Sequence, residues 1–329
     1  MIGSARAYSN IAFIKYWGNR DDTLRLALNG SISMNLAGLE TITTVEFSSD
    51  LEQDQLSING SDQSEGALAR VSAHLDHFRR RAAIDLRASV RSTNNFPAGT
   101  GVASSASAFA ALAVAADSAL ELHMSEKELS MYARLGSGSA CRSIPAGFVE
   151  WYAGPDDASS FAESLAPPEH WNLVDLVAIV SREHKAVGST GGHKVAPTSP
   201  LQGARVADAQ RRIDWCREAL LRRDFNALAE VIELDALMMH AVMMTSKPTL
   251  LYWTPATLGL IEAVRQWREK DGLPVAFTID AGPNVHVITE ASFAEEIAEG
   301  LRALPTVQEV LSGRPGGAAT AIDTHLRAS

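Results

Sequence analysis

Polar side chains crowd one short segment, Ile14-Lys15-Tyr16-Trp17-Gly18-Asn19-Arg20-Asp21-Asp22, directly after the apolar run "NIAFI". A lysine that leaves a buried strand needs an anionic partner or a wet cleft for its ammonium group. The segment therefore predicts a site for negative charge around Lys15. The alternative is a lysine whose aliphatic stem packs on Trp17 while its charge reaches water.

A glycine- and serine-rich loop is the second candidate for chemistry: Pro97-Ala98-Gly99-Thr100-Gly101-Val102-Ala103-Ser104-Ser105-Ala106-Ser107. Glycines let backbone N–H groups approach a ligand, and the start of a helix carries partial positive charge. Serine hydroxyls bind phosphate oxygens or a metal. The loop predicts a phosphate cradle, although it lacks the Gly-Lys-Ser/Thr of a P-loop. The alternative is an ordinary turn before a capped, alanine-rich helix.

Two further stretches carry side chains suited to binding and catalysis. Gly136-Ser137-Gly138-Ser139-Ala140-Cys141-Arg142-Ser143 places an arginine fork, which binds carboxylate or phosphate, beside two serines. The stretch "TIDAGPN" ends an apolar strand on Asp280 at a tight turn. Taken alone, Arg142 could lie in a surface loop and Asp280 could merely cap its turn.

Composition narrows the class of protein. The chain has 329 residues, of which 46% are hydrophobic and 21% charged, as in globular proteins. A net charge of −10 argues against a nucleic-acid partner, which requires a basic face, but leaves room for a basic pocket. The N-terminus "MIGSARAYSN" does not resemble a signal peptide, and no apolar run is long enough to span a membrane. We expect a cytoplasmic protein.

Cysteine and histidine chemistry is not indicated. Two cysteines, Cys141 and Cys216, are too few for a disulfide framework or a cysteine-based metal site. The histidines at 74, 184, 193, 240 and 286 lack metal-ligand spacing, so we interpret them as structural. Cys141 has no neighbouring histidine and acid, which indicates a packing role.

The elements that must position these side chains alternate without a regular β-α-β pattern. Strands are expected at 41–47, 55–60, 147–152 and 173–180, and two more within 275–289. Helices are expected at 65–81, 105–122, 124–135, 203–222 and 225–244. This mixture predicts an α+β fold. The length allows two domains, 1–180 and 181–329, with the boundary in the region 170–185.

Five stretches in one order resemble the mevalonate diphosphate decarboxylases of the GHMP kinase superfamily: "NIAFIKYWGNRD", "LNGSISMNL", "NNFPAGTGVASSASAFAAL", "GSGSACRS" and "FTIDAGPN". The resemblance covers nearly the whole chain. "KYWG", "GSGSACRS" and "DAGPN" are specific to the decarboxylase branch. The glycine-serine loop is shared by the superfamily.

This resemblance implies the GHMP kinase fold: an N-terminal domain of the ribosomal protein S5 domain 2-like type, a C-terminal α+β domain, and an active site in the cleft between them. It also implies the reaction. ATP, with Mg²⁺, phosphorylates the 3-hydroxyl of a phosphorylated mevalonate. The new phosphate then leaves as the neighbouring carboxylate is lost as CO₂. A homodimer is expected by analogy only.

Roles for individual residues follow from the same resemblance. Asp280 matches the catalytic aspartate at the 3-hydroxyl, Lys15 the lysine against it, and Arg142 the arginine that binds the substrate carboxylate. Ser105 matches the serine that faces the transferred phosphate, and it is the expected Mg²⁺ contact. The expected nucleotide-binding residues are Ser92, Asn95, Pro97, Gly99, Gly101, Ser104, Ser105 and Ser189. The expected substrate-binding residues are Asn10, Lys15, Tyr16, Asn19, Arg70, Ser137, Ser139 and Arg142.

Asn19 departs from the family pattern, which reads "KYWGK" with a second lysine on the diphosphate side of the pocket. Phosphomevalonate decarboxylases, which act on the monophosphate, can lack that lysine. We therefore predict mevalonate 5-phosphate as substrate, with mevalonate 5-diphosphate as the alternative. A mevalonate 3-kinase that stops at the phosphorylated alcohol is a more distant alternative. A non-catalytic ligand sensor is disfavoured by the complete set of Asp280, Lys15, Ser105 and Arg142.

Overall fold

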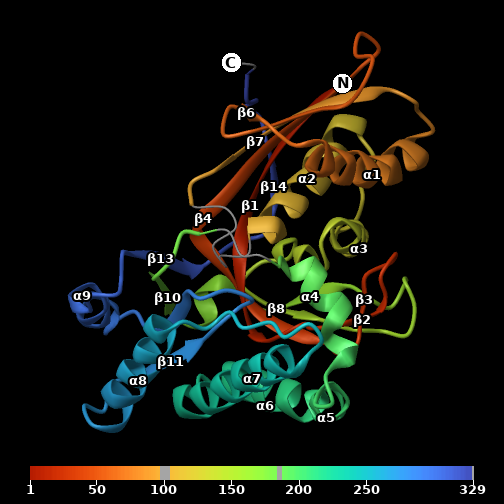
Figure 1. The fold of residues 1–329 in the computed structure, drawn as a ribbon. Helices are drawn as coiled ribbons and strands as arrows, with labels where there is room; N and C mark the ends of the chain where they lie inside the picture. The colour runs from red at the N-terminus through yellow and green to blue at the C-terminus, as the bar shows by residue number, and fades with distance from the viewer. Residues whose placement is uncertain (97–103, 184–186, 328–329) are drawn as a thin grey trace.

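A computed structural model describes residues 1–96, 104–183 and 187–327 of the chain. The described strands are β1 (Ile2–Ile14), β2 (Asn19–Asp21), β3 (Leu26–Ala27), β4 (Ser31–Ser48), β5 (Gln55–Ile58), β6 (Ser61–Asp62), β7 (Arg87–Asn94), β8 (Phe148–Trp151), β9 (Ala162–Ala166), β10 (Leu173–Ile179), β11 (Val275–Thr278), β12 (Val285–Glu290), β13 (Glu309–Pro315) and β14 (Thr320–Ile322). The described α-helices are α1 (Glu65–Ala82), α2 (Ser104–Leu120), α3 (Glu126–Gly136), α4 (Ser189–Val195), α5 (Gln202–Ala207), α6 (Ala209–Arg222), α7 (Phe225–Thr245), α8 (Pro255–Glu269) and α9 (Ala294–Ala303). The 3₁₀ helices are η1 (Gly138–Ser143), η2 (Pro168–His170) and η3 (Ala196–Thr198). The predicted α+β class is confirmed (Figure 1).

Local sequence signals explain how several elements begin and end. Helix α3 starts at a capping box, in which the Ser125 side chain accepts from the Glu128 N–H and the Glu128 carboxylate accepts from the Ser125 N–H. The turn after β5 has positive φ at Asn59 (51°) and Gly60 (77°), as the Asn-Gly pair predicts. Both features depend on neighbouring residues alone.

Two expected elements differ from those observed. The helix expected at 203–222 is divided into α5 and α6 at Asp208, whose carboxylate accepts hydrogen bonds from Arg211 and Arg212 in the first turn of α6. The strand expected at 41–47 is the second half of β4, an 18-residue strand. Strand β4 is this long because its two halves pair with different neighbours.

The described strands form a 12-stranded sheet and a separate two-stranded ribbon, β2–β3. Strand β4 is the spine of the large sheet: it pairs antiparallel with β1, β7, β8 and β13. The contact with β13, through Arg314 with Ala37 and Pro315 with Leu36, joins the later strands to the earlier ones. Near the C-terminus, β14 returns to pair with β1. The sheet therefore connects the two halves of the chain.

The expected boundary at residue 180 stays a prediction. Strand β10 ends at Ile179, just before that boundary, yet it pairs with β12 and β13 from the later half. Strand β14 lies beyond the boundary and pairs with β1. Sheet pairing therefore crosses residue 180 in both directions.

Helices cover the sheet in two groups (Figure 1). Helix α2 packs on β1 and β4, and its many buried alanines let its backbone come close to the strands. Helices α1 and α3 pack beside it. In the other half, α7 packs on β11, on α6 and on the end of β1, and α8 packs on β11 and β12. The C-terminal end of β1 consequently lies where both groups of helices meet.

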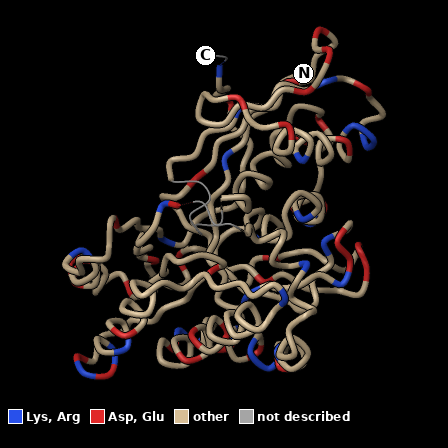
Figure 2. Tube along the Cα trace, viewed as in Figure 1, with Lys and Arg blue, Asp and Glu red and all other residues tan. Residues whose placement is uncertain are grey.

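Charged positions are distributed over both halves of the molecule, mostly in helices and loops (Figure 2). Among the described helices, none is both long enough and apolar enough to cross a membrane. Some charged side chains are nevertheless buried, among them Lys15, Arg142, Arg205, Arg212 and Asp235. These buried charges lie around the candidate site.

Candidate active site

A salt bridge joins the end of β1 to the turn between β11 and β12. The Lys15 ammonium lies 2.6 Å from Asp280 Oδ1. The side chain of Lys15 is 2% exposed, whereas that of Asp280 is 25% exposed at the cavity. The anionic partner predicted for Lys15 is thus present, and the packing alternative, in which its charge reaches water, is wrong.

This pair sets the charge state of Asp280. Burial acts to raise the pKa of the Asp280 carboxyl group, but the Lys15 ammonium, with smaller contributions from His286 and Arg142, outweighs it and holds the pKa below its ordinary value. Asp280 is therefore an anion at neutral pH and a weak base. Such a carboxylate is better suited to orient a hydroxyl group than to remove its proton.

Arg142 reaches the same cavity from helix η1. Its Nη1 donates to Ser31 Oγ at 2.7 Å, and its Nη2 donates to Asn10 Oδ1 at 3.2 Å. Asn10 is itself oriented because its amide nitrogen donates to Ser143 Oγ at 2.8 Å. Burial lowers the pKa of Arg142, while nearby anions including Asp280 oppose this shift. The guanidinium remains charged and is fixed in one plane.

Aromatic packing shapes the wall between these charges. The ring of Tyr16 stacks on His193 with centroids 4.1 Å apart and meets Trp151 edge-on. A side chain at Gly138 would clash here, because its Cβ would lie 2.6 Å from the Tyr16 ring. Only glycine at position 138 allows the start of η1 to approach Tyr16 this closely.

Hydroxyl groups line the cavity from three elements. Ser105 lies in the first turn of α2, and its Oγ is 3.2 Å from Ser137 Oγ. Ser139 lies in η1, and Ser189 is the first residue of α4. All four serines line the cavity that contains Lys15, Arg142 and Asp280. The structure thus brings together most of the predicted catalytic and substrate-binding residues.

Other predicted residues lie outside that cavity. Asn19 lines an adjoining hollow with Asp22, Thr23, Arg25, Thr190 and Lys194. The Arg70 guanidinium donates to Gly136 O at 2.8 Å and lies over the Phe109 ring. Asn10 stands behind the cavity-lining Arg142, whereas Arg70 contacts Gly136, the residue before the lining Ser137.

The predicted nucleotide-binding residues are more scattered. Ser92 shares a hydrogen bond with Thr43 and lines a small apolar hollow with Leu56, Ile58 and Phe109. The Asn95 side chain bridges Gly38 O and Glu40 N–H. Ser104 begins α2 but does not line the cavity. Pro97, Gly99 and Gly101 lie outside the described residues.

Among the lining residues that sequence reasoning missed are Arg25, Thr190 and His193, whose side chains can carry charge or form hydrogen bonds. Arg25 follows the polar cluster at Lys15 and points back to it because the β2–β3 ribbon reverses the chain. Thr190 and His193 are neighbours of Ser189 in "VGSTGGH", where the family resemblance implies a role for the serine alone. Burial lowers the pKa of His193 to about 3, so this ring is a neutral group in the wall.

Oxygen donors suited to Mg²⁺ are present, but they are hydroxyl groups. No group of three or more His, Cys, Asp or Glu side chains with metal-binding geometry occurs within residues 1–96, 104–183 and 187–327. Mg²⁺ commonly binds through a few protein oxygens together with substrate phosphates. Ser105, close to Ser137, fits this kind of site.

Comparison of the folded chain with solved structures identifies its class. The fold superimposes with a TM-score of 0.93 on a solved structure described as MDDEF in complex with MVAPP, AMPPCP and magnesium. The two chains are 36% identical in sequence, and the match covers 98% of this chain and 99% of the other. The predicted GHMP kinase fold is confirmed.

Sequence comparison identifies the family. Residues 7–162 match the diphosphomevalonate decarboxylase-like N-terminal domain, and residues 175–318 match the mevalonate 5-diphosphate decarboxylase C-terminal domain. The chain is 36% identical to a diphosphomevalonate decarboxylase of Candida albicans, covering 89% of this chain and 86% of the relative. It is 34% identical to a phosphomevalonate decarboxylase of Haloferax volcanii, with 92% of both chains covered. The chain belongs to this decarboxylase family and is an enzyme of it.

Proposed function

We propose that this enzyme decarboxylates mevalonate 5-phosphate to isopentenyl phosphate in an ATP-dependent reaction. The observation that carries the decarboxylase chemistry is the convergence of the Lys15–Asp280 pair and Arg142 on one cavity. An anionic carboxylate beside an ammonium suits a hydroxyl group, and a fixed guanidinium suits a carboxylate. A 3-hydroxy acid carries both groups a few bonds apart.

In the proposed reaction, the 3-hydroxyl oxygen attacks the γ-phosphorus of ATP, the bond from this phosphorus to the β,γ-bridging oxygen breaks, and ADP leaves with that electron pair. The hydroxyl proton passes to the phosphoryl oxygens or to solvent. Asp280 orients this hydroxyl group, and Lys15 keeps Asp280 anionic. The C3–O bond then breaks and phosphate leaves with that electron pair. The C1–C2 bond breaks at the same time, CO₂ leaves, and its electrons form the C2=C3 double bond. Arg142 holds the carboxylate until this step.

The hydroxyl groups at the start of α2 and α4 are the proposed contacts for ATP. Ser105 and Ser189 line the cavity. In this proposal both lie next to the transferred phosphate, and Ser105 also contacts Mg²⁺. Magnesium supplies neutralisation of phosphate charge when bound. Support comes from the solved relative that holds both AMPPCP and magnesium. The roles of Ser92, Asn95, Pro97, Gly99, Gly101 and Ser104 in nucleotide binding, and of Arg70 in substrate binding, stay predictions.

The choice of the monophosphate depends on Asn19. Its amide nitrogen donates to Asp22 at 2.7 Å, and its amide oxygen accepts from the Tyr16 hydroxyl. Position 19 therefore adds no positive charge, and it holds a carboxylate in the hollow that it lines. A second phosphate entering this hollow would meet the negative charge of Asp22, which disfavours a diphosphate.

The diphosphate alternative also has an observation in its favour. Arg25 and Lys194 line the same hollow as Asn19, and they offer two positive charges. In addition, several relatives are named diphosphomevalonate decarboxylases.

The deciding experiment offers mevalonate, its 5-phosphate and its 5-diphosphate side by side and measures release of ADP and of CO₂. A higher kcat/KM for the 5-phosphate, with one CO₂ for each ADP, is the expected result. ADP release without CO₂ would indicate a 3-kinase. A higher kcat/KM for the 5-diphosphate would overturn the choice of substrate and leave the decarboxylase assignment in place.

A further inference from the structure

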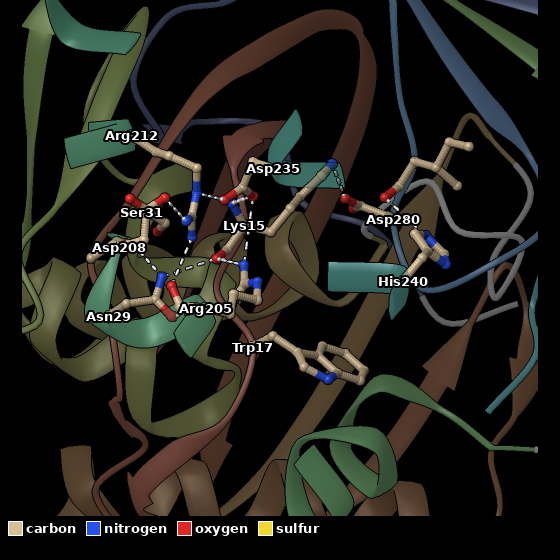
Figure 3. A network of polar contacts seen from close by, with 12 residues as sticks. Lys15, Trp17, Asn29, Ser31, Arg205, Asp208, Arg212, Asp235, His240 and Asp280 are labelled. Carbon is tan, nitrogen blue, oxygen red and sulfur yellow. Dashed lines mark hydrogen bonds and ion pairs between the residues drawn. The ribbon is translucent and has the colours of Figure 1, made fainter. Parts of the chain in front are cut away.

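The backbone of Lys15 is held on both sides by side chains (Figure 3). Its N–H donates to Asp235 Oδ2 at 2.7 Å. Its carbonyl oxygen accepts from Arg205 Nη2 at 2.8 Å and from Asn29 Nδ2 at 3.0 Å. Strand β1 ends one residue earlier, at Ile14, so these side chains take over from the sheet ladder.

The side chains that hold Lys15 belong to a buried ionic network. Asp235, in the middle of α7, also accepts from Arg212 Nε at 2.8 Å and lies 3.5 Å from Arg205 Nη2. Arg212 in turn donates to Arg205 O at 3.0 Å and to Asp208 at 2.6 Å. Arg205, Arg212 and Asp235 are each at most 1% exposed. Each of these three residues therefore forms a hydrogen bond or ion pair with at least two other members of the network.

Buried ion pairs are a poor route to stability, because the cost of removing charges from water often exceeds their attraction. Apolar residues of similar size usually serve a core as well. This network instead ends at the backbone N–H and the backbone carbonyl group of Lys15. Figure 3 shows that the Lys15 side chain runs from this point to Asp280.

We propose that Asp235, Arg205 and Asn29 are positioning residues for the decarboxylation, acting through Lys15. The lysine stem has four rotatable bonds, so the place of its ammonium depends on where its Cα is held. Asp235 of α7 holds the backbone N–H of Lys15, and Arg205 of α5 together with Asn29, just before β4, holds its carbonyl oxygen. This inference rests on the roles proposed above for Lys15 and Asp280.

A purely structural role for the network makes a different prediction. If it only stabilised the fold, loss of Asp235 would lower the melting temperature and leave the chemistry of the folded fraction unchanged. If it positions Lys15, the ammonium moves away from Asp280 when the network is broken. Burial would then raise the pKa of Asp280, and activity would fall at acidic pH where the wild type remains active.

The test compares Asp235→Asn with Asp54→Asn. Asp54 is a matched control: it is buried, pairs with the buried Arg79, and accepts a backbone N–H from Ala88 at 2.8 Å, but it does not line the cavity. We expect Asp235→Asn to lower kcat about tenfold or more, with KM for ATP within about threefold. The acid limb of kcat/KM should move to higher pH. The control should keep wild-type kcat and acid limb even if it melts earlier, and it corrects for ionisation of the substrate phosphate.

Two milder variants keep the proposal testable if Asp235→Asn does not fold. Arg205→Lys and Asn29→Ala each weaken the hold on the Lys15 carbonyl and should lower kcat about two- to tenfold with the same shift of the acid limb. The proposal is overturned if the variants that fold have the kcat of wild type and the same acid limb in the pH profile of kcat/KM. It is also overturned if none of the three variants folds. Asp280→Asn distinguishes a failure of the proposed function from a failure of this inference. If Asp280→Asn stays active, the proposed role of Asp280 is wrong. If Asp280→Asn is inactive while Asp235→Asn behaves as wild type, only the positioning role of Asp235 is wrong.

Discussion

At the residue scale, three of the charged groups that line the cavity suit it to a hydroxy acid: Lys15, Asp280 and Arg142. Asp280 and Lys15 compensate each other at 2.6 Å, so their sum adds little net charge. Arg142 is buried without a carboxylate partner in the described part of the chain, since Ser31 and Asn10 are neutral. A buried guanidinium of this kind attracts an anionic ligand. We therefore expect the Lys15–Asp280 pair to orient the 3-hydroxyl group and Arg142 to bind the substrate carboxylate.

Replacing Asp280 by asparagine tests the orienting role. Asp280→Asn keeps the shape of the side chain but removes its negative charge, so Lys15 loses its anionic partner and the 3-hydroxyl loses its anionic acceptor. We expect kcat below about 10% of wild type and a substrate Kd within about tenfold, because an isosteric change removes an interaction used mainly in the transition state. Single-turnover kinetics and direct binding measure the two quantities. A variant that keeps more than this share of kcat contradicts the role.

Replacing Asn19 by lysine tests the substrate. In Asn19→Lys, the new ammonium would meet the second phosphate of a diphosphate, which is worth roughly 1.5–3 kcal/mol for a charge-assisted contact. The ratio of kcat/KM values should shift toward the 5-diphosphate by about 10- to 150-fold. Added salt should reduce this shift, since the hollow is open to solvent.

Competition between the two substrates, measured with wild type and with Asn19→Lys, gives that ratio directly. Asn19→Gln is the control, because it lengthens the side chain without adding charge. If wild type already prefers the diphosphate and the lysine changes little, Arg25 and Lys194 supply the charge and the monophosphate choice is wrong.

At the element scale, helix α4 is attached to the turn after β1 through His193. Its Nδ1 accepts the Gly18 N–H at 2.9 Å, and its ring stacks on Tyr16 and tilts against Trp17. Gly18 has φ = +98°, a conformation that glycine adopts readily. The neutral imidazole of His193 thus joins helix α4, which carries Ser189, to the turn after β1, which carries Tyr16.

His193→Leu should separate these two elements. The Gly18 N–H would lose its acceptor in a buried place, which costs about 1–3 kcal/mol of unfolding free energy. KM for the phosphorylated substrate should rise, because Tyr16 and Ser189 are no longer held together. Urea unfolding and steady-state kinetics measure both effects. His193→Asn should restore much of the stability, since its amide oxygen can occupy the place of Nδ1; equal losses in the two variants would argue against this hydrogen bond.

At the scale of the whole molecule, several histidines are buried as neutral groups. Burial lowers the pKa values of His74, His193 and His240 to about 3. In the unfolded chain each would have a pKa of about 6.5. Unfolding therefore takes up protons below pH 6.5, and the stability of the fold falls as pH falls from there toward 3. His286 acts in the opposite direction: burial alone would lower its pKa, but Asp175, 2.7 Å away, raises it.

This balance predicts sensitivity to mild acid. Each of the three neutral histidines costs about 1.4 kcal/mol of unfolding free energy at pH 5.5, and His286 offsets part of the sum. We expect a net loss of about 2–4 kcal/mol between pH 7.5 and 5.5, measured by urea unfolding at both values. His74→Leu should reduce the loss by about 1.4 kcal/mol, the contribution of one histidine. Both ring nitrogens of His74 lie without a hydrogen-bond partner in the described structure, so this change leaves no hydrogen bond broken. An unchanged pH dependence in that variant would contradict the assignment.

Local sequence determined the parts that depend on near neighbours. The capping box at Ser125 and Glu128, the turn at Asn59 and Gly60 and the helix α1 depend on residues at most four positions apart. The helices expected at 65–81 and 124–135 are accordingly observed as α1 and α3. The order of the five family stretches likewise identified the fold class and the family. Asn19 was visible as a departure because it stands alone within a recognisable pattern.

Only the tertiary structure decided how those parts meet. Lys15 and Asp280 are 265 positions apart, and only the family resemblance placed them together in advance. Lys15 and Asp235 are 220 positions apart, and no pattern in the sequence links them. Asp235 lies in a helix whose sequence gives no sign that one carboxylate points to the end of β1. The place of His193 against Tyr16 and the pairing of β10 with β12 and β13 are of the same kind. Such contacts arise because burial of the two helix groups on one sheet brings distant residues together, and the energy that selects them is spread over the whole core.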